Sequence, residues 1–189
     1  MPLDETDCFK GHFLLAMPGL KDPNFNQTVT CLCEHTSQGA FGLVVNRHFP
    51  SLLLSNVFEE LKIEFQPEVG QGPVYIGGPV RMDEIFVLHG PPLTWKGTLG
   101  ITPQLAITNT KDILKAIAQG EGPSDFLLTL GCAGWGPGQL ESEVLDNAWL
   151  NQPADPAIIF RTPIDARWER AIKNLGIDPH ALSQTAGHA

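Results

Sequence analysis

The chain has 189 residues, of which 42% are hydrophobic, and it carries a formal net charge of −9 with an isoelectric point near 5.0. This length suits one domain or at most two small ones, and the apolar fraction is ample for a buried core. The negative balance and the scattered lysines and arginines argue against a surface that binds nucleic acid or an anionic membrane through counterion release.

Neither a targeting segment nor a membrane span is predicted. The apolar run 13–17 ends at Pro18, which makes it too short for the core of a secretory signal. No run approaches the roughly 18 apolar residues of a membrane helix. Four cysteines in a chain of this size do not resemble a secreted disulfide scaffold. We therefore expect a protein of the reducing cytoplasm.

Strand and helix signals alternate from the start of the chain. The apolar run 11–17 predicts a strand, and a loop rich in proline and glycine follows over 18–23. Residues 28–35 and 40–46 predict two strands that the polar turn 36–39 joins into a hairpin. The second strand is apolar nearly throughout, which indicates that both of its faces are covered.

The middle of the chain continues this alternation, and 67–73 is its best candidate for a mobile loop. Asn109 or Thr110 can cap a helix that Gly120 ends. The pattern predicts a short helix at 54–61, four strands at 74–77, 84–89, 94–99 and 101–107, and the capped helix at 110–120.

The last helix has the clearest signals. Thr162 is its predicted cap, Pro163 its first residue, and Gly176 ends it. Its apolar stripe consists of Trp168, Ile172 and Leu175. After about residue 178 the tail thins to small and polar residues and is expected to fray. The alternation as a whole predicts an α/β fold.

The segment 126–150 resembles a strand, a glycine-rich turn and a helix start. An apolar run at 126–130 meets glycines at 131, 134, 136 and 138, Pro137 suits a helix N-terminus with Gly136 as its cap, and an acidic helix follows. Such a junction is a possible anion site. However, Gly138 precedes Gln139 rather than the lysine of a phosphate loop, and no lysine or arginine occurs from 116 to 160.

Three interpretations of this junction remain open. It can be a tight turn that packs a helix on a sheet with Trp135 and Trp149 as anchors, a binding cleft, or a catalytic turn. A nucleophilic Cys132 with a distant histidine base is conceivable. No local signature supports that pairing, and no flanking cation is visible to lower the thiol pKa.

A second candidate site is the run Cys31-Leu32-Cys33-Glu34-His35. On a regular strand, Cys31, Cys33 and His35 point to one face and offer thiolates and an imidazole to a metal, with Cys8 or Cys132 as fourth ligand. Alternating strand positions hold the sulfurs roughly 6.5 to 7 Å apart, too far to share a zinc without distortion. We therefore expect buried structural thiols and no metal. For His35 and for His89, at another strand end, we expect donation to a backbone carbonyl.

Several motifs resemble those of the AlgH/YqgE family of bacterial proteins, and they cover about 140 residues in the family's order. They are Met17-Pro18-Gly19-Leu20-x-Asp22-Pro23-x-Phe25, Cys33-Glu34-His35, Gly42-Leu43-Val44-Val45-Asn46-Arg47, Val74-Tyr75-x-Gly77-Gly78-Pro79-Val80, Gly134-Trp135-Gly136-x-Gly138-Gln139-Leu140-Glu141 and Asn147-x-Trp149.

The resemblance implies a compact single-domain α/β sandwich over residues 1–189, with a mixed sheet and flanking helices, in the bacterial cytosol. The family name is tied to the regulation of alginate and other gene expression, and the resemblance supplies no activity, cofactor or catalytic residue. We expect a non-enzymatic regulatory protein that acts indirectly through an unidentified protein partner. Nothing resembles a basic recognition helix, so direct nucleic-acid binding is not expected. The alternative is a small-molecule-binding protein or a thiol-dependent enzyme that uses a cleft at Gly131–Gly138.

The residues predicted to bind the partner or ligand come from the three glycine-rich motif loops, which we expect to converge on one shallow cleft. Trp135, with glycine on both sides, is expected to have little local cover and to anchor a partner, unless it is a core residue. The predicted binding residues are Pro18, Gly19, Asp22, Phe25, Gly77, Gly78, Pro79, Gly134, Trp135, Gln139, Leu140 and Glu143.

Overall fold

The computed structural model describes residues 8–182, which form ten β-strands and six α-helices. The strands are β1 His12–Ala16, β2 Val29–Thr36, β3 Gly39–Val44, β4 His48–Leu53, β5 Pro73–Ile76, β6 Val80–His89, β7 Leu99–Thr102, β8 Leu105–Thr108, β9 Phe126–Trp135 and β10 Trp149–Pro153. The helices are α1 Leu54–Glu60, α2 Pro67–Gly70, α3 Lys111–Ala118, α4 Gln139–Leu145, α5 Pro156–Arg161 and α6 Arg167–Asn174.

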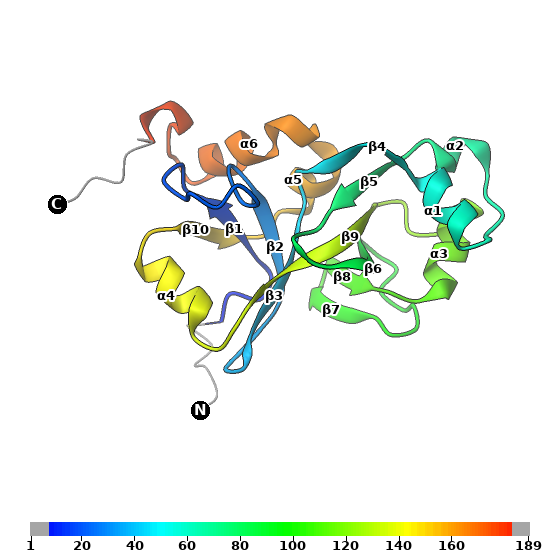
Figure 1. Cartoon of the computed structure of the whole chain (residues 1–189), viewed down its shortest axis with the longest axis horizontal. Helices are drawn as coiled ribbons and strands as arrows, with labels where there is room; N and C mark the ends of the chain where they lie inside the picture. The colour runs from blue at the N-terminus through cyan, green and yellow to red at the C-terminus, as the bar shows by residue number, and fades with distance from the viewer. Residues whose placement is uncertain (1–7, 183–189) are drawn as a thin grey trace.

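Strand β9 joins two groups of strands. The first group, β10-β1-β2-β3, is antiparallel and meets β9 where Ala40–Gly42 pairs with 133–135. The second group places β6 antiparallel on one side of β9 and β5 parallel on the other, with β8 and β7 beyond β6 and β4 beyond β5. Figure 1 shows β9 running diagonally between the two groups. The predicted α/β fold with a mixed sheet and flanking helices is confirmed.

Alternating side chains of β9 serve two different cores. Leu127 lies in the larger apolar cluster, which α5 and α6 cover through residues such as Ile159 and Ile172. Leu128, its neighbour, points to the other face and packs in a cluster with α1 and α3. Complete burial of such a leucine side chain stabilises the fold by about 1.5 to 3 kcal/mol. A third cluster lies beneath α4 and contains Leu140.

Several predicted elements are confirmed. The strand at 11–17, the hairpin over 28–46, the short helix at 54–61 and the helix that ends at Gly120 all occur, within a few residues of their predicted bounds. Both faces of β3 are covered, as its apolar run indicated, because Leu43 packs in the larger cluster and Ala40 in the third cluster.

Other expectations about the elements were wrong. Residues 94–98 are not a strand, and the pair of strands there is β7 and β8. The loop expected at 67–73 contains α2, whose first residue is a proline. Thr162 does not cap α6; it follows α5, and a 3₁₀ turn at Ile164–Ala166 precedes α6.

The largest correction concerns the glycine-rich turn predicted at 131–138. Residues 126–135 form one continuous strand, so only Gly136, Pro137 and Gly138 make the turn into α4. The residue that caps α4 is Gly138, with a φ of 72°, and not Gly136. Glycine suits this left-handed conformation because it has no Cβ.

Near the C-terminus, Pro179–Ala181 forms a 3₁₀ turn in which the Asp178 carboxylate accepts from the His180 N–H at 3.0 Å. The rest of the tail expected to fray lies outside the described residues. Within 8–182, no helix combines the length and the apolar character that crossing a membrane requires.

Candidate functional site

The third motif segment is organised around one carboxylate. Glu143 Oε2 accepts the indole N–H groups of Trp135 at 2.9 Å and Trp149 at 2.8 Å, while its Oε1 accepts from the Gln139 side chain at 2.9 Å. The Gln139 Oε1 in turn accepts the N–H of Gly136 at 3.0 Å, which closes the turn before α4. One glutamate therefore fastens the helix start to the ends of two strands.

This network corrects the expectation that Trp135 has little local cover. Trp135 is 6% exposed, and its ring packs edge-on against Trp149 with centroids 5.9 Å apart. Phe25, from the first motif segment, lies against both indoles. The structure thus favours the core interpretation of Trp135, and Leu140, fully buried below α4, has no surface to offer a partner. Gln139 is exposed.

The first motif segment belongs to the loop between β1 and β2. Pro18 and Phe25 are half-buried, and Gly19 is exposed. Asp22 is exposed and accepts from the backbone N–H of Asn24 at 2.9 Å, which fixes a local turn.

The second motif segment lies where β5 ends beside β9. Gly77 and Gly78 are buried, and Pro79 is exposed. A small pocket of about 180 Å³ brings Gly78 and Pro79 together with Asn24 of the first segment. Gly134 of the third segment lies instead in a groove of about 450 Å³ beside Val80. The first segment therefore packs against the third through Phe25 and shares a pocket with the second through Asn24, at two separate places.

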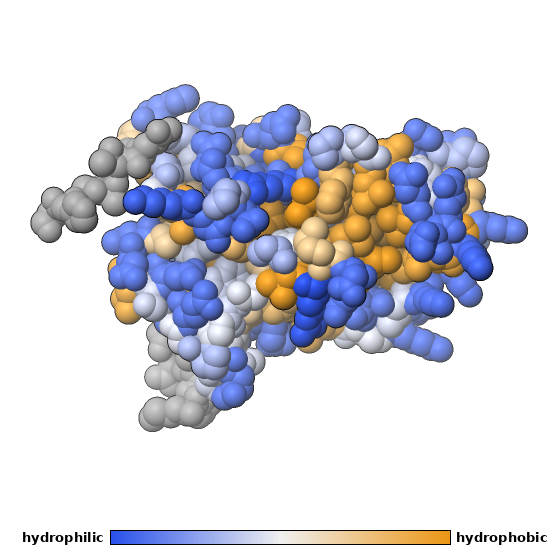
Figure 2. All heavy atoms as spheres, in the orientation of Figure 1, coloured by the Kyte–Doolittle hydropathy of each residue, from blue (hydrophilic) through white to orange (hydrophobic). Residues whose placement is uncertain are grey.

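A row of apolar side chains crosses the middle of the sheet next to this second segment. Ile76 of β5 is in register with Leu130 of β9, and Leu130 is in register with Ile85 of β6, so the three share one face. All three are only half-buried, and Met82, which lines a small pocket together with Ile76, is 41% exposed. We call these four residues the apolar row. Figure 2 shows hydrophobic surface over the region where β4, β5 and β9 lie in Figure 1.

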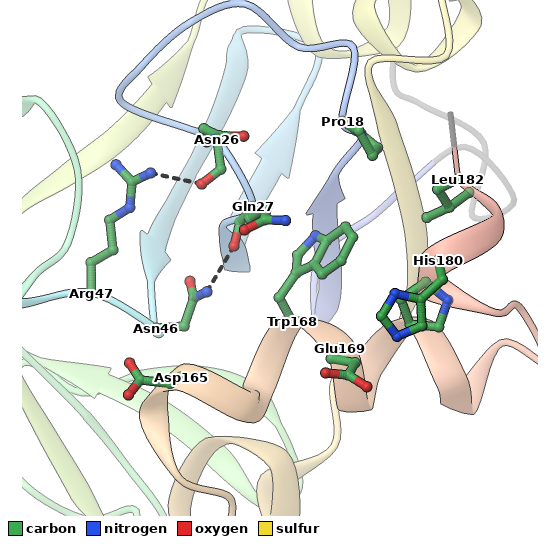
Figure 3. A pocket seen from close by; sticks show the side chains of 11 residues that line it. Pro18, Asn26, Gln27, Asn46, Arg47, Asp165, Trp168, Glu169, His180 and Leu182 are labelled. Atoms are coloured by element: carbon green, nitrogen blue, oxygen red, sulfur yellow. Dashed lines mark hydrogen bonds between the residues drawn. The ribbon is translucent and has the colours of Figure 1, made fainter. Parts of the chain in front are cut away.

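A polar pocket of about 600 Å³ shares Arg47 with the small pocket at Gly78 and Pro79. One wall is the loop 24–27 with the residues that follow β3, and the other wall is the start of α6 with the 3₁₀ turn at Pro179–Ala181. Figure 3 shows its lining side chains, which are Pro18, Asn26, Gln27, Asn46, Arg47, Asp165, Trp168, Glu169, Pro179, His180 and Leu182. Of these, only Pro18 belongs to the residues predicted to bind a partner or ligand.

Hydrogen bonds hold the loop wall of this pocket in place. The Arg47 guanidinium donates to the carbonyls of Pro23, Asn24 and Asn26 at 3.1, 2.8 and 2.7 Å. The Asn46 side chain accepts the Val29 N–H at 2.7 Å and donates to the Gln27 carbonyl at 2.9 Å. Gln27 has a φ of 52°, a left-handed conformation that side chains rarely adopt. The loop is thus fastened to the end of β3 from several directions.

Cys31, Cys33 and Cys132 are buried inside the larger apolar cluster, and Cys8 is half-buried. Burial raises the pKa of Cys33 well above its ordinary value, and the neighbouring Cys31 adds to this shift. Burial also raises the pKa of Cys132, although the charge of Arg81 opposes the shift. A cation therefore does lie near Cys132, contrary to the expectation from the sequence, but it comes from β6.

The expected alignment of Cys31, Cys33 and His35 on one face was wrong. A β-bulge interrupts the pairing of β2 with β3 between Leu32 and Glu34. Both thiols stay in the larger cluster, but His35 contacts α4, where its Nε2 donates to Glu141 at 3.1 Å and its Nδ1 accepts the Phe9 N–H at 3.0 Å. Within residues 8–182, no three histidine, cysteine or acidic side chains are grouped as metal ligands.

His89 behaves as expected for a histidine at a strand end. Its Nδ1 donates to the Gly90 carbonyl at 2.7 Å, and its Nε2 accepts from the Thr108 hydroxyl at 2.9 Å. Burial lowers the pKa of His89, so the ring stays neutral near pH 7.

Comparison with known proteins identifies the family. The family model described as AlgH-like matches residues 13–180. A UPF0301 protein of Desulforapulum autotrophicum is 48% identical over 184 residues, which are 97% of each chain. The solution structure of the AlgH protein from Pseudomonas aeruginosa is 48% identical, covers 100% of both chains and superposes with a TM-score of 0.80. A crystal structure from Corynebacterium diphtheriae, 22% identical over 95% of this chain and 92% of its own with a TM-score of 0.73, shares the fold. The chain therefore belongs to the AlgH-like family of UPF0301 proteins, as its motifs predicted.

Proposed function

We propose that the protein is a non-enzymatic regulatory protein of the bacterial cytoplasm that binds a protein partner through its apolar row. Through that partner it affects gene expression indirectly, including that of alginate genes. The observation that supports the proposal is the half-exposed line of Ile76, Leu130 and Ile85, beside which Met82 is exposed. Contiguous apolar surface of this kind is a feature of interaction sites.

The size of the row indicates a weak contact. Covering the exposed parts of its four side chains removes on the order of 200 Å² of apolar surface from water, a gross gain of about 5 kcal/mol. Association itself costs about 4 to 15 kcal/mol. The partner must therefore gain further stability at the rim, where Arg81 and Glu84 lie exposed with their charged atoms 3.7 Å apart. We expect a transient complex with an affinity in the micromolar range or weaker.

The alternative of a thiol-dependent enzyme receives less support. The segment 131–135, expected to form its cleft, belongs to a paired strand. Because the pKa of Cys132 is raised, its thiol is protonated at neutral pH, and the thiolate is the form that reacts.

Two aspartate substitutions test the proposal. Met82→Asp places a charge in the apolar row, whereas Leu145→Asp places the same charge on α4, at a leucine that is 82% exposed. Affinity capture from the cytosol of the bacterium that makes the protein, with each variant as bait, should lose the same partner with Met82→Asp and retain it with Leu145→Asp. Equal retention by both variants would remove the apolar row as the binding surface.

The regulatory part of the proposal has its own measurement. Transcript profiles of a deletion strain should be restored by the Leu145→Asp protein and not by the Met82→Asp protein. If both restore the profile, partner binding at the row is not how the protein affects expression.

A further inference from the structure

We propose that the polar pocket between the loop 24–27 and α6 binds a small organic cation, an ammonium or guanidinium compound. None of the apolar-row residues lines this pocket, and the inference does not rest on the proposed partner. Its volume of about 600 Å³ is within the range of pockets that hold small molecules.

The one arginine of the pocket has its charge directed away from a ligand. The terminal nitrogens of Arg47 donate to three backbone carbonyls of the adjacent loop, and Figure 3 shows the guanidinium turned toward Asn26. A guanidinium that is held in this way braces the loop and has few donors left for an anionic ligand. The pocket is therefore poorly suited to a phosphate or a carboxylate.

The opposite wall supplies two carboxylates. Asp165, in the 3₁₀ turn before α6, and Glu169, in the first turn of α6, both line the pocket. Asp165 is exposed. Glu169 bonds Lys173 through Oε1 at 2.5 Å, and this contact lowers the pKa of Glu169, so its carboxylate is ionised at neutral pH. Among residues 8–182, no hydrogen bond uses the other oxygen of Glu169, which can accept from a ligand.

The remaining lining groups accept hydrogen bonds and offer an aromatic surface. The side-chain amides of Asn26 and Gln27 face the pocket and can accept N–H groups through their oxygens. Trp168 lies at the centre of the wall, and its own N–H is used on the Ala16 carbonyl at 3.0 Å. Because its N–H is already bonded, Trp168 presents ring carbon atoms to the cavity. An ammonium or guanidinium group is attracted to the face of such an indole ring. Acceptors, carboxylates and an indole together select a ligand rich in N–H groups and positive charge.

Calorimetric titration with spermidine, glucose and inorganic phosphate as probes tests this inference. We expect saturable binding of spermidine with a dissociation constant below about 1 mM at low salt, weakening as salt screens the carboxylates. Glucose and phosphate should give no saturable signal. A pocket that prefers either of them, or that shows no spermidine binding, would overturn the assignment.

Charge-neutral variants separate the pocket from the general acidity of the surface. Asp165→Asn and Glu169→Gln should each weaken spermidine binding about 3- to 10-fold, because each removes one partly exposed charge contact. Glu59→Gln, at an exposed position of α1 at the other end of the molecule, should leave spermidine binding unchanged. In NMR spectra of the full chain, spermidine should shift the signals of Trp168 and His180. Equal weakening in all three variants, or shifts spread over the whole surface, would show non-specific attraction to the net charge and refute the site.

Discussion

Glu143 should be one of the most important polar side chains for stability, because both of its oxygens are used inside the fold. Glu143→Ala removes the acceptor of the Trp135 and Trp149 indole N–H groups, which lie 2.9 and 2.8 Å from one oxygen, on residues only 6% and 3% exposed. A hydrogen bond to a charged group is worth about 1.5 to 3 kcal/mol. Because the two bonds share an oxygen and water can partly replace it, we expect a loss of about 3 kcal/mol rather than the full sum.

Urea unfolding followed by circular dichroism measures this loss as a lower midpoint with an unchanged slope. For a chain of this length, about 3 kcal/mol corresponds to a fall in Tm of roughly 6 to 12 °C. Glu143→Gln keeps one acceptor oxygen and should fall between the wild type and Glu143→Ala. Glu59→Ala, at an exposed position of α1, should change the free energy of unfolding by less than about 0.5 kcal/mol. If Glu143→Ala costs no more than this control, the glutamate does not hold the two strands and α4 together.

Three further expectations concern titration, thiols and DNA. His89 has a lowered pKa, so below about pH 6.5 the unfolded chain binds a proton that the folded chain does not, and the free energy of unfolding should fall by up to about 1.4 kcal/mol for each unit of decreasing pH. In a series of urea-unfolding measurements at different pH, His89→Gln should make this pH dependence weaker. If the variant shows the same pH dependence as the wild type, His89 is not the group responsible. Cys31→Ser and Cys33→Ser should each cost about 1 to 3 kcal/mol, whereas Cys8→Ser and a chelator should leave the Tm nearly unchanged; a sharp drop with chelator would instead indicate a metal site. Labelled duplex DNA at about 50 mM salt should show no saturable binding below tens of micromolar, given the net charge of −9; a salt-sensitive complex below 1 μM would be incompatible with this reasoning.

Local sequence correctly predicted those elements whose conformation is determined by their own residues. The hairpin over 28–46 has two apolar runs around a polar turn, and both strands formed within two residues of their predicted ends. The helix α5 had a signal of the same kind that was overlooked. Asp155 precedes Pro156, and its carboxylate accepts the Ala157 N–H at 2.8 Å, as an N-cap does. With six residues, this helix is too short to show an apolar period.

Local sequence gave the wrong prediction where pairing with strands distant in the sequence determines the conformation. Glycines at 131 and 134 favoured a turn, yet both belong to β9. Gly134 pairs with Phe41 of β3, and Gly131, with a φ of 75°, lies so close to the end of β5 that an added Cβ would be 2.6 Å from the Gly78 carbonyl. Strand pairing supplies the stability that glycine lacks by itself.

Different physical requirements place the two sets of residues. Close packing of backbones places the glycines of the family motifs, whereas the docking of distant elements places the residues that line the polar pocket. A Cβ on Gly77 would lie 2.1 Å from the Gly131 carbonyl oxygen, and one on Gly78 would lie 2.2 Å from the Cys132 backbone, so close packing of β5 on β9 requires both glycines. Such a requirement leaves a recognisable local motif. Asp165 and Glu169, in contrast, face the loop 24–27 only because α6 docks beside β1 and β2, and no spacing in the sequence records that approach. A motif can thus locate where backbones must pass closely, whereas the chemistry of this pocket follows only from the tertiary structure.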